Sequence, residues 1–125
     1  MKRDMNLVRR IVLMARNAEP GRAITADDFP DDDAFLLAVQ YHVRIMIDAG
    51  LLIGNTVGTL QSVGFGIDGL TWEGQDFADL FADDATWATF RRDVLDKAAG
   101  ATLDAILAAA RAWGRKTLLA AAGLS

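Results

Sequence analysis

The feature that most constrains this chain is a glycine-punctuated stretch at its centre. Residues 51–70 hold five glycines among β-branched and aromatic side chains, a composition typical of a two-stranded β-hairpin. On both sides of this stretch, apolar residues recur at three- and four-residue spacing, which predicts helices. The chain has no further strands from which to build a parallel sheet. The pattern therefore favours a mainly α fold with one small β-hairpin.

Start and stop signals give the order of the elements. The aspartates after Pro30 are typical of a helix start, and Gly50 of a helix end, because carboxylates cap free amides and glycine permits a left-handed exit. The predicted elements are, in order, a helix at Asp4–Asn17, a short strand at Ala23–Thr25, a helix at Asp32–Ala49, the hairpin at Leu51–Leu70, and helices at Thr71–Phe81, Asp83–Gly100 and Thr102–Ala122.

This order is that of a winged helix-turn-helix with a C-terminal helical extension. We expect a winged-helix domain at residues 1–82 and a helical extension at residues 83–125 that packs on it as one globular unit. The length of 125 residues agrees, since a chain of this size buries enough surface for a core of its own. In the extension, the predicted apolar stripes are Trp87, Phe90, Val94 and Ala98, and then Leu103, Ile106, Leu107, Ala110, Trp113, Thr117, Leu118 and Ala121.

Charge is divided unevenly along the chain. The formal net charge is −4, but residues 1–24 carry six basic and two acidic side chains, and residues 91–125 carry six basic and three acidic ones. Between these ends, residues 25–40 and residues 71–90 each hold five acidic side chains and no cation. A nucleic-acid-binding protein normally presents a basic face to the polyanion. Where the acidic residues 25–40 and 71–90 lie in the fold therefore decides whether the partner is a nucleic acid or a protein.

Composition also limits the chemistry and the compartment. With no cysteine, the chain has no disulfide, thiolate ligand or thiol nucleophile. No apolar run approaches the about 20 residues of a membrane span. The first ten residues carry five charges, which is unlike a signal peptide. We expect a cytoplasmic protein with no membrane partner.

Each motif that could indicate catalysis or a cofactor is better explained by a structural role. Gly64, Gly66 and Gly69 spell the G-x-G-x-x-G of dinucleotide sites, but the βαβ unit that such a site requires is missing, so we interpret them as hairpin residues. His42 is the only histidine and cannot form a two-histidine metal site. We expect it to be a half-buried packing residue with one satisfied nitrogen. The prediction is a non-enzymatic protein with no metal and no cofactor.

Two further clusters have structural explanations. The five aspartates from Asp27 to Asp33 lack the glycine and the glutamate of a calcium loop, and helix capping explains them. Trp72, Trp87 and Trp113 have apolar helical neighbours. Their surroundings favour core or subunit contact over a platform for stacking bases.

A family likeness is carried by four stretches: MKRDMNLVRR at the start, YHVRIMIDAGLL at Tyr41–Leu52, GLTWEGQDF at Gly69–Phe77 and DDATWATF at Asp83–Phe90. In this order and spacing they resemble an uncharacterised bacterial and phage family, domain of unknown function 2513, over nearly the whole chain. The resemblance implies a winged-helix fold and frequent residence in phages and prophages. It implies no reaction, because the family has none assigned.

In a winged helix that binds DNA, the helix at Asp32–Ala49 would enter the major groove. With about 100° per residue, its buried side consists of Leu36, Val39, Val43, Met46 and Ile47. Its outward side consists of Leu37, Ala38, Tyr41, Ile45 and Asp48, with Gln40 and Arg44 at the edges. This outward side is mostly apolar, and a helix that is apolar all round is usually covered by another surface.

Two binding hypotheses follow. In the first, the chain is a small acidic module for protein contact, either as a homodimer or with a partner such as a host nucleic-acid-binding protein. Its interface candidates are Leu37, Tyr41, Ile45 and Trp113. The alternative is a sequence-specific DNA-binding regulator with base contacts from Gln40, Tyr41 and Arg44 and phosphate contacts from Lys2, Arg3, Arg9 and Arg10. It ranks second because residues 51–70 hold no Lys or Arg to meet phosphate.

Overall fold

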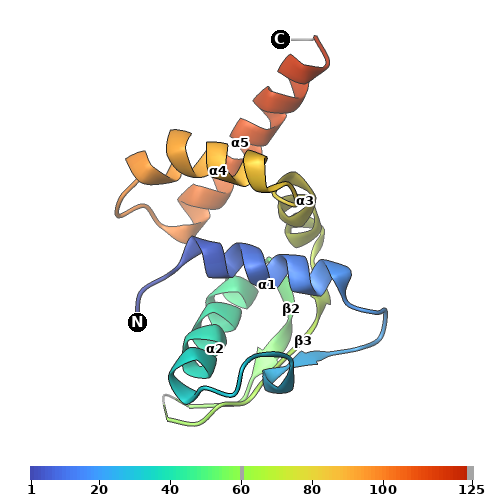
Figure 1. The fold of residues 1–125 in the computed structure, drawn as a ribbon, viewed down its shortest axis with the longest axis vertical. Coiled ribbons are helices and arrows are strands. Elements are labelled where there is room, and N and C mark those ends of the chain that lie inside the picture. The colour runs from blue at the N-terminus through green and yellow to red at the C-terminus, as the bar shows by residue number, and fades with distance from the viewer. Residues whose placement is uncertain (60, 124–125) are drawn as a thin grey trace. The chain divides into compact units, whose positions relative to one another are not determined.

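The computed structural model describes residues 1–59 and 61–123 (Figure 1). The contacts between residues divide the chain into two compact units, a first unit at Met1–Ala78 and a second unit from Asp79 onward. This division falls earlier than the predicted one at residues 82 and 83. Phe81 falls in the second unit, where its ring packs against Trp87 and Trp113.

The first unit opens with helix α1 at Met5–Asn17, as the sequence predicts. The Asp4 side chain caps α1 by accepting a hydrogen bond of 2.9 Å from the Asn6 amide. The residues that α1 buries are Leu7, Val8, Ile11 and Val12. After α1 come strand β1 at Ile24–Thr25 and a short 3-10 helix, η1, at Ala26–Asp28.

Helix α2 spans Asp33–Asp48. The Asp32 side chain caps it by accepting a 2.9 Å hydrogen bond from the Phe35 amide, so the aspartate run does serve as a helix start. At the other end, Gly50 has a φ of 80°, a conformation that residues with a Cβ resist. The buried side of α2 is Leu36, Val39, Val43 and Met46 as predicted, whereas Ile47 is only half-buried.

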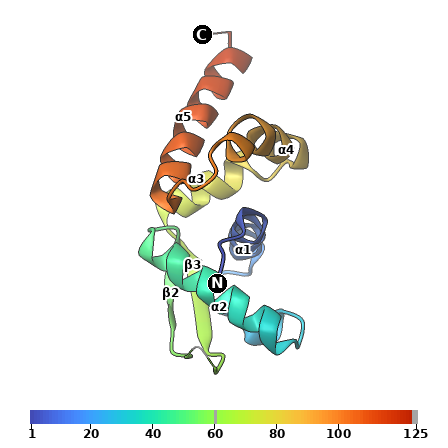
Figure 2. The same ribbon diagram turned by 90° about the vertical axis from the view of Figure 1, so that its left-hand side faces the viewer.

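Strands β2 at Leu52–Thr56 and β3 at Phe65–Leu70 form the predicted hairpin. In the described part of the chain they join β1 in one antiparallel sheet of three strands, in the order β1-β3-β2. Figures 1 and 2 show α1 and α2 beside this sheet, and the sheet side chains of Leu52, Phe65 and Ile67 are buried. The G-x-G-x-x-G glycines therefore lie in an antiparallel hairpin rather than at a strand-to-helix turn.

Helix α3 at Trp72–Leu80 follows β3 directly. Thr71 caps α3, because Thr71 Oγ1 accepts a hydrogen bond of 3.0 Å from the Gly74 amide. Gly74 itself is buried where α3 crosses the backbone carbonyl of Leu51, and a Cβ on Gly74 would collide with that oxygen. Only glycine permits this close approach.

The second unit contains helix α4 at Asp84–Asp93, the 3-10 helix η2 at Leu95–Lys97, and helix α5 at Leu103–Ala121. The prediction of one helix from Asp83 to Gly100 is wrong at its end, so Val94 and Ala98 do not extend the stripe of Trp87 and Phe90. Val94 leaves the helical conformation, with φ −121° and ψ −60°. Arg91 and Arg92 in the last turn of α4 suit its negative end, a stop signal that the apolar stripe obscured.

The second unit is organised around aromatic rings. Phe90 is fully buried, and its centroid lies 4.8 Å from that of Phe81 and 5.3 Å from that of Trp113. Among the described residues, no helix combines the length and the apolar character needed to cross a membrane.

Candidate interaction surface

The outward side of α2 is only partly open, and its apolar residues are not fully exposed. Leu37, Ala38, Tyr41 and Ile45 are all half-buried, while Arg44 and Asp48 are exposed. The interface candidates Leu37, Tyr41 and Ile45 are therefore partly covered within the chain. For contacts to DNA bases, this side of α2 offers one exposed cation, Arg44, with the carboxylate of Asp48 one turn further on.

Gln40 is not at the edge of an exposed face. It is 8% exposed, and its side chain holds the hairpin loop. Gln40 Nε2 donates to the backbone carbonyls of Thr59 at 3.0 Å and Ser62 at 3.2 Å, and Gln40 Oε1 accepts from the Gly64 amide at 2.7 Å. The proposed base contact by Gln40 is corrected for this reason, since its donors and its acceptor are already used inside the fold.

His42 is more deeply buried than predicted and has both ring nitrogens satisfied. It is 1% exposed. Its Nε2 accepts a hydrogen bond of 2.8 Å from the Asp4 amide, which requires that Nδ1 carry the proton and donate to the Ala38 carbonyl at 2.7 Å. The ring therefore ties the start of α1 to α2 and has no free nitrogen for a substrate or a metal.

The cations proposed for phosphate contact differ in what they can reach. Lys2 and Arg10 are exposed, while Arg3 and Arg9 are half-buried and have partners within the chain. The Arg10 guanidinium lies over two rings, 6.0 Å from the Phe29 centroid and 5.4 Å from the Phe35 centroid. The N-terminal cations therefore do not form a set that is free to follow a DNA backbone.

A further cation is paired with a carboxylate. Arg22 forms a salt bridge with Asp28, and the Asp28 side chain also accepts a hydrogen bond of 2.9 Å from the Thr25 amide. The hydrogen bond from the Thr25 backbone, followed by that from Arg22, lowers the pKa of Asp28 below its ordinary value. The pair stabilises the start of η1. Among the five aspartates from Asp27 to Asp33, Asp28 therefore has its charge compensated by a cation.

Trp113 belongs to the aromatic packing of the second unit. It is half-buried, with its ring stacked 6.2 Å from Phe81. The ring already packs inside the chain, and its assignment as an interface residue stays a prediction for the part of it that is exposed. Its place on the apolar stripe of α5 gave no means of telling these two roles apart.

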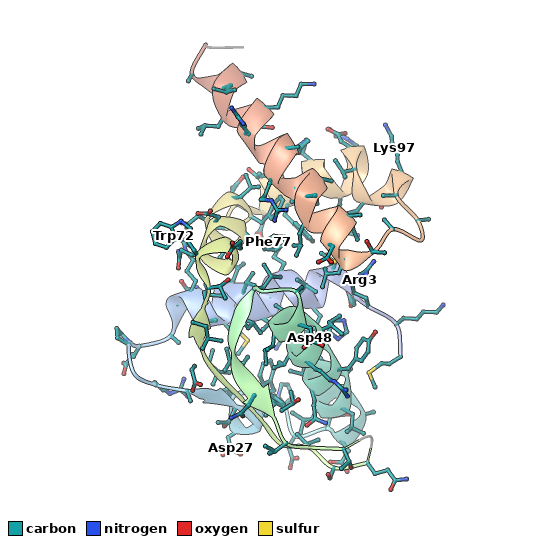
Figure 3. The ribbon with its side chains drawn as sticks, turned by 180° about the vertical axis from the view of Figure 1, so that it is seen from behind. Arg3, Asp27, Asp48, Trp72, Phe77 and Lys97 are labelled. Carbon is teal, nitrogen blue, oxygen red and sulfur yellow. The ribbon has the colours of Figure 1, made fainter. Side chains whose placement is uncertain are left out.

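Besides Met1, the large apolar side chains that the first unit exposes most lie on the hairpin and at the start of α3. Ile53 is 53%, Val57 79% and Trp72 83% exposed. Ile53 points outward on β2, and Val57 is the first residue after that strand. Trp72 is the first residue of α3, which follows β3, and Figure 3 shows its indole projecting away from the ribbon. We call Ile53, Val57 and Trp72 the hairpin face. Strand alternation from the buried Leu52 is the signal that would have found Ile53.

The surroundings of the hairpin face are acidic. Residues 45–90 contain seven acidic side chains and no Lys or Arg. Asp68 on β3 and Glu73 and Asp76 on α3 are exposed. A stretch of chain that carries carboxylates and no cation beside exposed apolar side chains suits an apolar and basic partner better than a polyanion.

The structure also has a small hollow on the first unit. It has a volume of about 160 Å³ and lies between the end of α1, β1 and β3, with Glu19, Arg22 and Asp68 among its lining residues. In the described residues, no group of three or more histidine and carboxylate side chains is arranged to hold a metal ion.

The fold and this surface define a small, mainly helical protein with a three-stranded sheet and an acidic, partly apolar hairpin. The chain belongs to the family described as Hypothetical protein (DUF2513), which residues 2–101 match, so the resemblance noted from the sequence is confirmed. It is 28% identical over 107 residues to an uncharacterized protein of Haemophilus influenzae, across 85% of this chain and 89% of that protein. No solved structure matches it.

Proposed function

We propose that the chain is a non-enzymatic winged-helix protein that acts in protein contact. The order α1-β1-η1-α2-β2-β3 and the antiparallel sheet β1-β3-β2 support the winged-helix assignment, with the hairpin as the wing. In this interpretation α2 takes the place of the recognition helix, and the second unit is the helical extension.

The observation that carries the proposal is the hairpin face. Contiguous exposed apolar patches are typical of interaction sites, and we take Ile53, Val57 and Trp72 as members of such a patch. Here they stand in a region without a cation, so the wing lacks the charges that neutralise phosphate. A protein whose own nucleic-acid-binding surface is basic has the matching chemistry, and in a phage such a partner would be a host protein.

The alternative is a DNA-binding regulator. It is favoured by the exposure of Lys2, Arg10 and Arg44 on the first unit. It ranks second because Gln40 is engaged by the hairpin loop, which leaves Arg44 and Tyr41 to read bases.

Two arms of one binding experiment test the proposal. The immobilised chain is offered duplex DNA at low salt, and separately a nuclease-treated bacterial lysate whose retained proteins are identified by mass spectrometry. We expect the chain to retain no DNA and to retain basic proteins from the lysate. The Trp72→Ser variant should fail to retain these proteins, whereas the Lys97→Ala variant, a change on η2, should still retain them. Retention of DNA that weakens with salt and with Arg44→Ala would replace the proposal by its alternative.

A further inference from the structure

The hollow on the first unit lies where the chain passes from α1 to the sheet. In Figure 1 the chain leaves the end of α1, loops outward and returns as β1 beside β3. β1 pairs with β3 at Gly66 and Ile67, and not at Asp68 or Gly69. Ile24, Asp68 and Gly69 are among the residues that line the hollow. The hollow therefore occupies the place beside β3 that β1 does not reach.

Asp68 is the extra residue of a β-bulge at this place. β3 pairs with β2 through Gly69 with Ile53 and through Ile67 with Gly54, which leaves Asp68 without a partner residue on β2. A bulge re-aims side chains and is often found beside a functional site. Asp68 is exposed and lines the hollow, so the bulge brings a carboxylate to it.

The hollow is negatively charged. The charged residues that line it are Glu19, Arg22 and Asp68. The charge of Arg22 is compensated by its salt bridge with Asp28. Within residues 1–59 and 61–123, the side chains of Glu19 and Asp68 have no hydrogen bond and no ion pair. Two carboxylates without a cation thus remain at the hollow, which suits a cationic group and disfavours an anion.

The size and the walls of the hollow favour one kind of cation. Its volume is about 160 Å³. A cavity of about 150 Å³ admits benzene, which has six heavy atoms, and an arginine side chain also has six beyond its Cβ. Apolar residues suit the methylene stem of an arginine, and carboxylates accept paired hydrogen bonds from its planar guanidinium. The apolar residues that line the hollow are Ala15, Ala18, Pro20, Ile24 and Ile67.

We propose that this hollow binds the guanidinium of an arginine that the partner protein presents. This inference rests on the proposed function, protein contact through the hairpin face, and names a group that the partner carries. The hollow adjoins the hairpin face, because Gly69 lines the hollow and pairs directly with Ile53. Neighbouring strands are about 4.8 Å apart, and Gly69 has no side chain to separate the two. An apolar neighbour of the bound arginine therefore reaches Ile53 and loses water there.

A small guanidinium compound has the same charged group as an arginine side chain. The hairpin face favours the protein source, because only a peptide offers an apolar side chain next to its arginine. The test therefore compares three probes: propylguanidinium, the capped tripeptide Leu-Arg-Leu, and the same tripeptide with citrulline, which is close to arginine in shape but uncharged, in place of arginine.

Amide chemical shifts of the full chain in solution, followed during titration with each probe, give both the site and the affinity. We expect propylguanidinium and the arginine peptide to shift the amides of Gly21, Arg22, Asp68 and Gly69, which line the hollow. The arginine peptide should bind at least tenfold more tightly than propylguanidinium. The citrulline peptide should bind at least tenfold more weakly than the arginine peptide, and added salt should weaken the binding of both charged probes.

Variants separate the hollow from the hairpin face. Glu19→Gln and Asp68→Asn should each weaken the binding of both charged probes at least threefold, whereas Ile53→Ser should weaken only that of the arginine peptide. Asp27→Asn, an exposed carboxylate of the same unit that does not line the hollow, should change neither. All four side chains are exposed, so the variants should keep the far-UV circular dichroism of the parent chain.

Four results would overturn the inference: no binding of the arginine peptide, equal binding of the citrulline peptide, binding unchanged in both Glu19→Gln and Asp68→Asn, or propylguanidinium as tight as the peptide. The last result would make a free guanidinium compound the ligand. Peptide binding that depends on Ile53 but not on the arginine removes the hollow as a site and leaves protein contact standing. Arg44-dependent retention of DNA instead removes the proposed function itself.

Discussion

At the scale of single residues, the Gln40 amide joins α2 to the hairpin loop. Gln40→Leu removes hydrogen bonds to the Thr59 and Ser62 carbonyls and from the Gly64 amide. The Ser62 carbonyl still accepts from the Thr59 amide, whereas the Thr59 carbonyl and the Gly64 amide lose the partner that Gln40 provided. We expect the free energy of unfolding to fall by about 1–3 kcal/mol, the usual cost of unsatisfied buried polar groups. Urea unfolding measures this loss. Gln61→Leu, an exposed position in the same loop, serves as the control and should change little.

The Asp28 carboxylate makes part of the stability depend on pH. Because folding lowers the pKa of Asp28 from its ordinary value of 3.8, the stabilisation is complete above that value and is lost as the pH falls through the lower, folded pKa. Asp28→Asn should therefore be less stable than the parent chain near neutral pH, and the difference should shrink in acid. Urea unfolding at several pH values checks this, with the exposed Asp27→Asn as the matched change. A difference that stays constant into acid would contradict it.

At the scale of elements, Gly74 sets how closely α3 approaches the start of β2. Gly74→Ala adds a methyl group against the Leu51 carbonyl, and overpacking of this kind costs about 1–3 kcal/mol, against the about 1 kcal/mol that alanine returns inside a helix. We expect a net loss of thermal stability. Gly69→Ala on β3 is the comparison, because a Cβ there meets nothing within 4 Å. Equal melting temperatures for both variants would show that α3 can move away.

The helices and strands could be predicted from the sequence because the residues that start and end them act locally. Caps at Asp4, Asp32 and Thr71 and the left-handed Gly50 each act within one helical turn, and the helix bounds follow them closely. The end of α4 was not predicted, because an apolar stripe shows that residues repeat at helical spacing and does not show where the helix ends.

The surface was harder to predict from the sequence, since the exposure of a side chain depends on which other parts of the chain cover it. A helical wheel gives the direction of a side chain but cannot say that a loop near Ser62 folds back on Gln40. For the same reason Trp113, on an apolar stripe, proved to be a packing residue, while Trp72 proved to be exposed.

At the scale of the whole molecule, the acidic charge belongs to one of the units. Residues 1–78 carry seven basic and eleven acidic side chains, whereas residues 79–125 carry six of each. Within the balanced second unit, the cations of α5 are separated along the chain from the acids around α4. Association through these surfaces is therefore a matter of local charge, and the net charge of −4 understates how strongly each surface is polarised.

The last prediction concerns the separate cores of the two units. Phe90 is fully buried, and its ring lies 5.9 Å from Trp87 and 5.3 Å from Trp113. Phe90→Ala opens a cavity among these rings and should cost about 3–5 kcal/mol, a large part of what a small unit possesses. We expect faster amide hydrogen exchange in α4 and α5, with α1 and α2 protected as before. Val43→Ala, a fully buried site in the first unit, should give the opposite pattern. If both variants raised exchange in all the helices alike, the chain would unfold as one cooperative body, and a single core would have to replace the two inferred from its contacts.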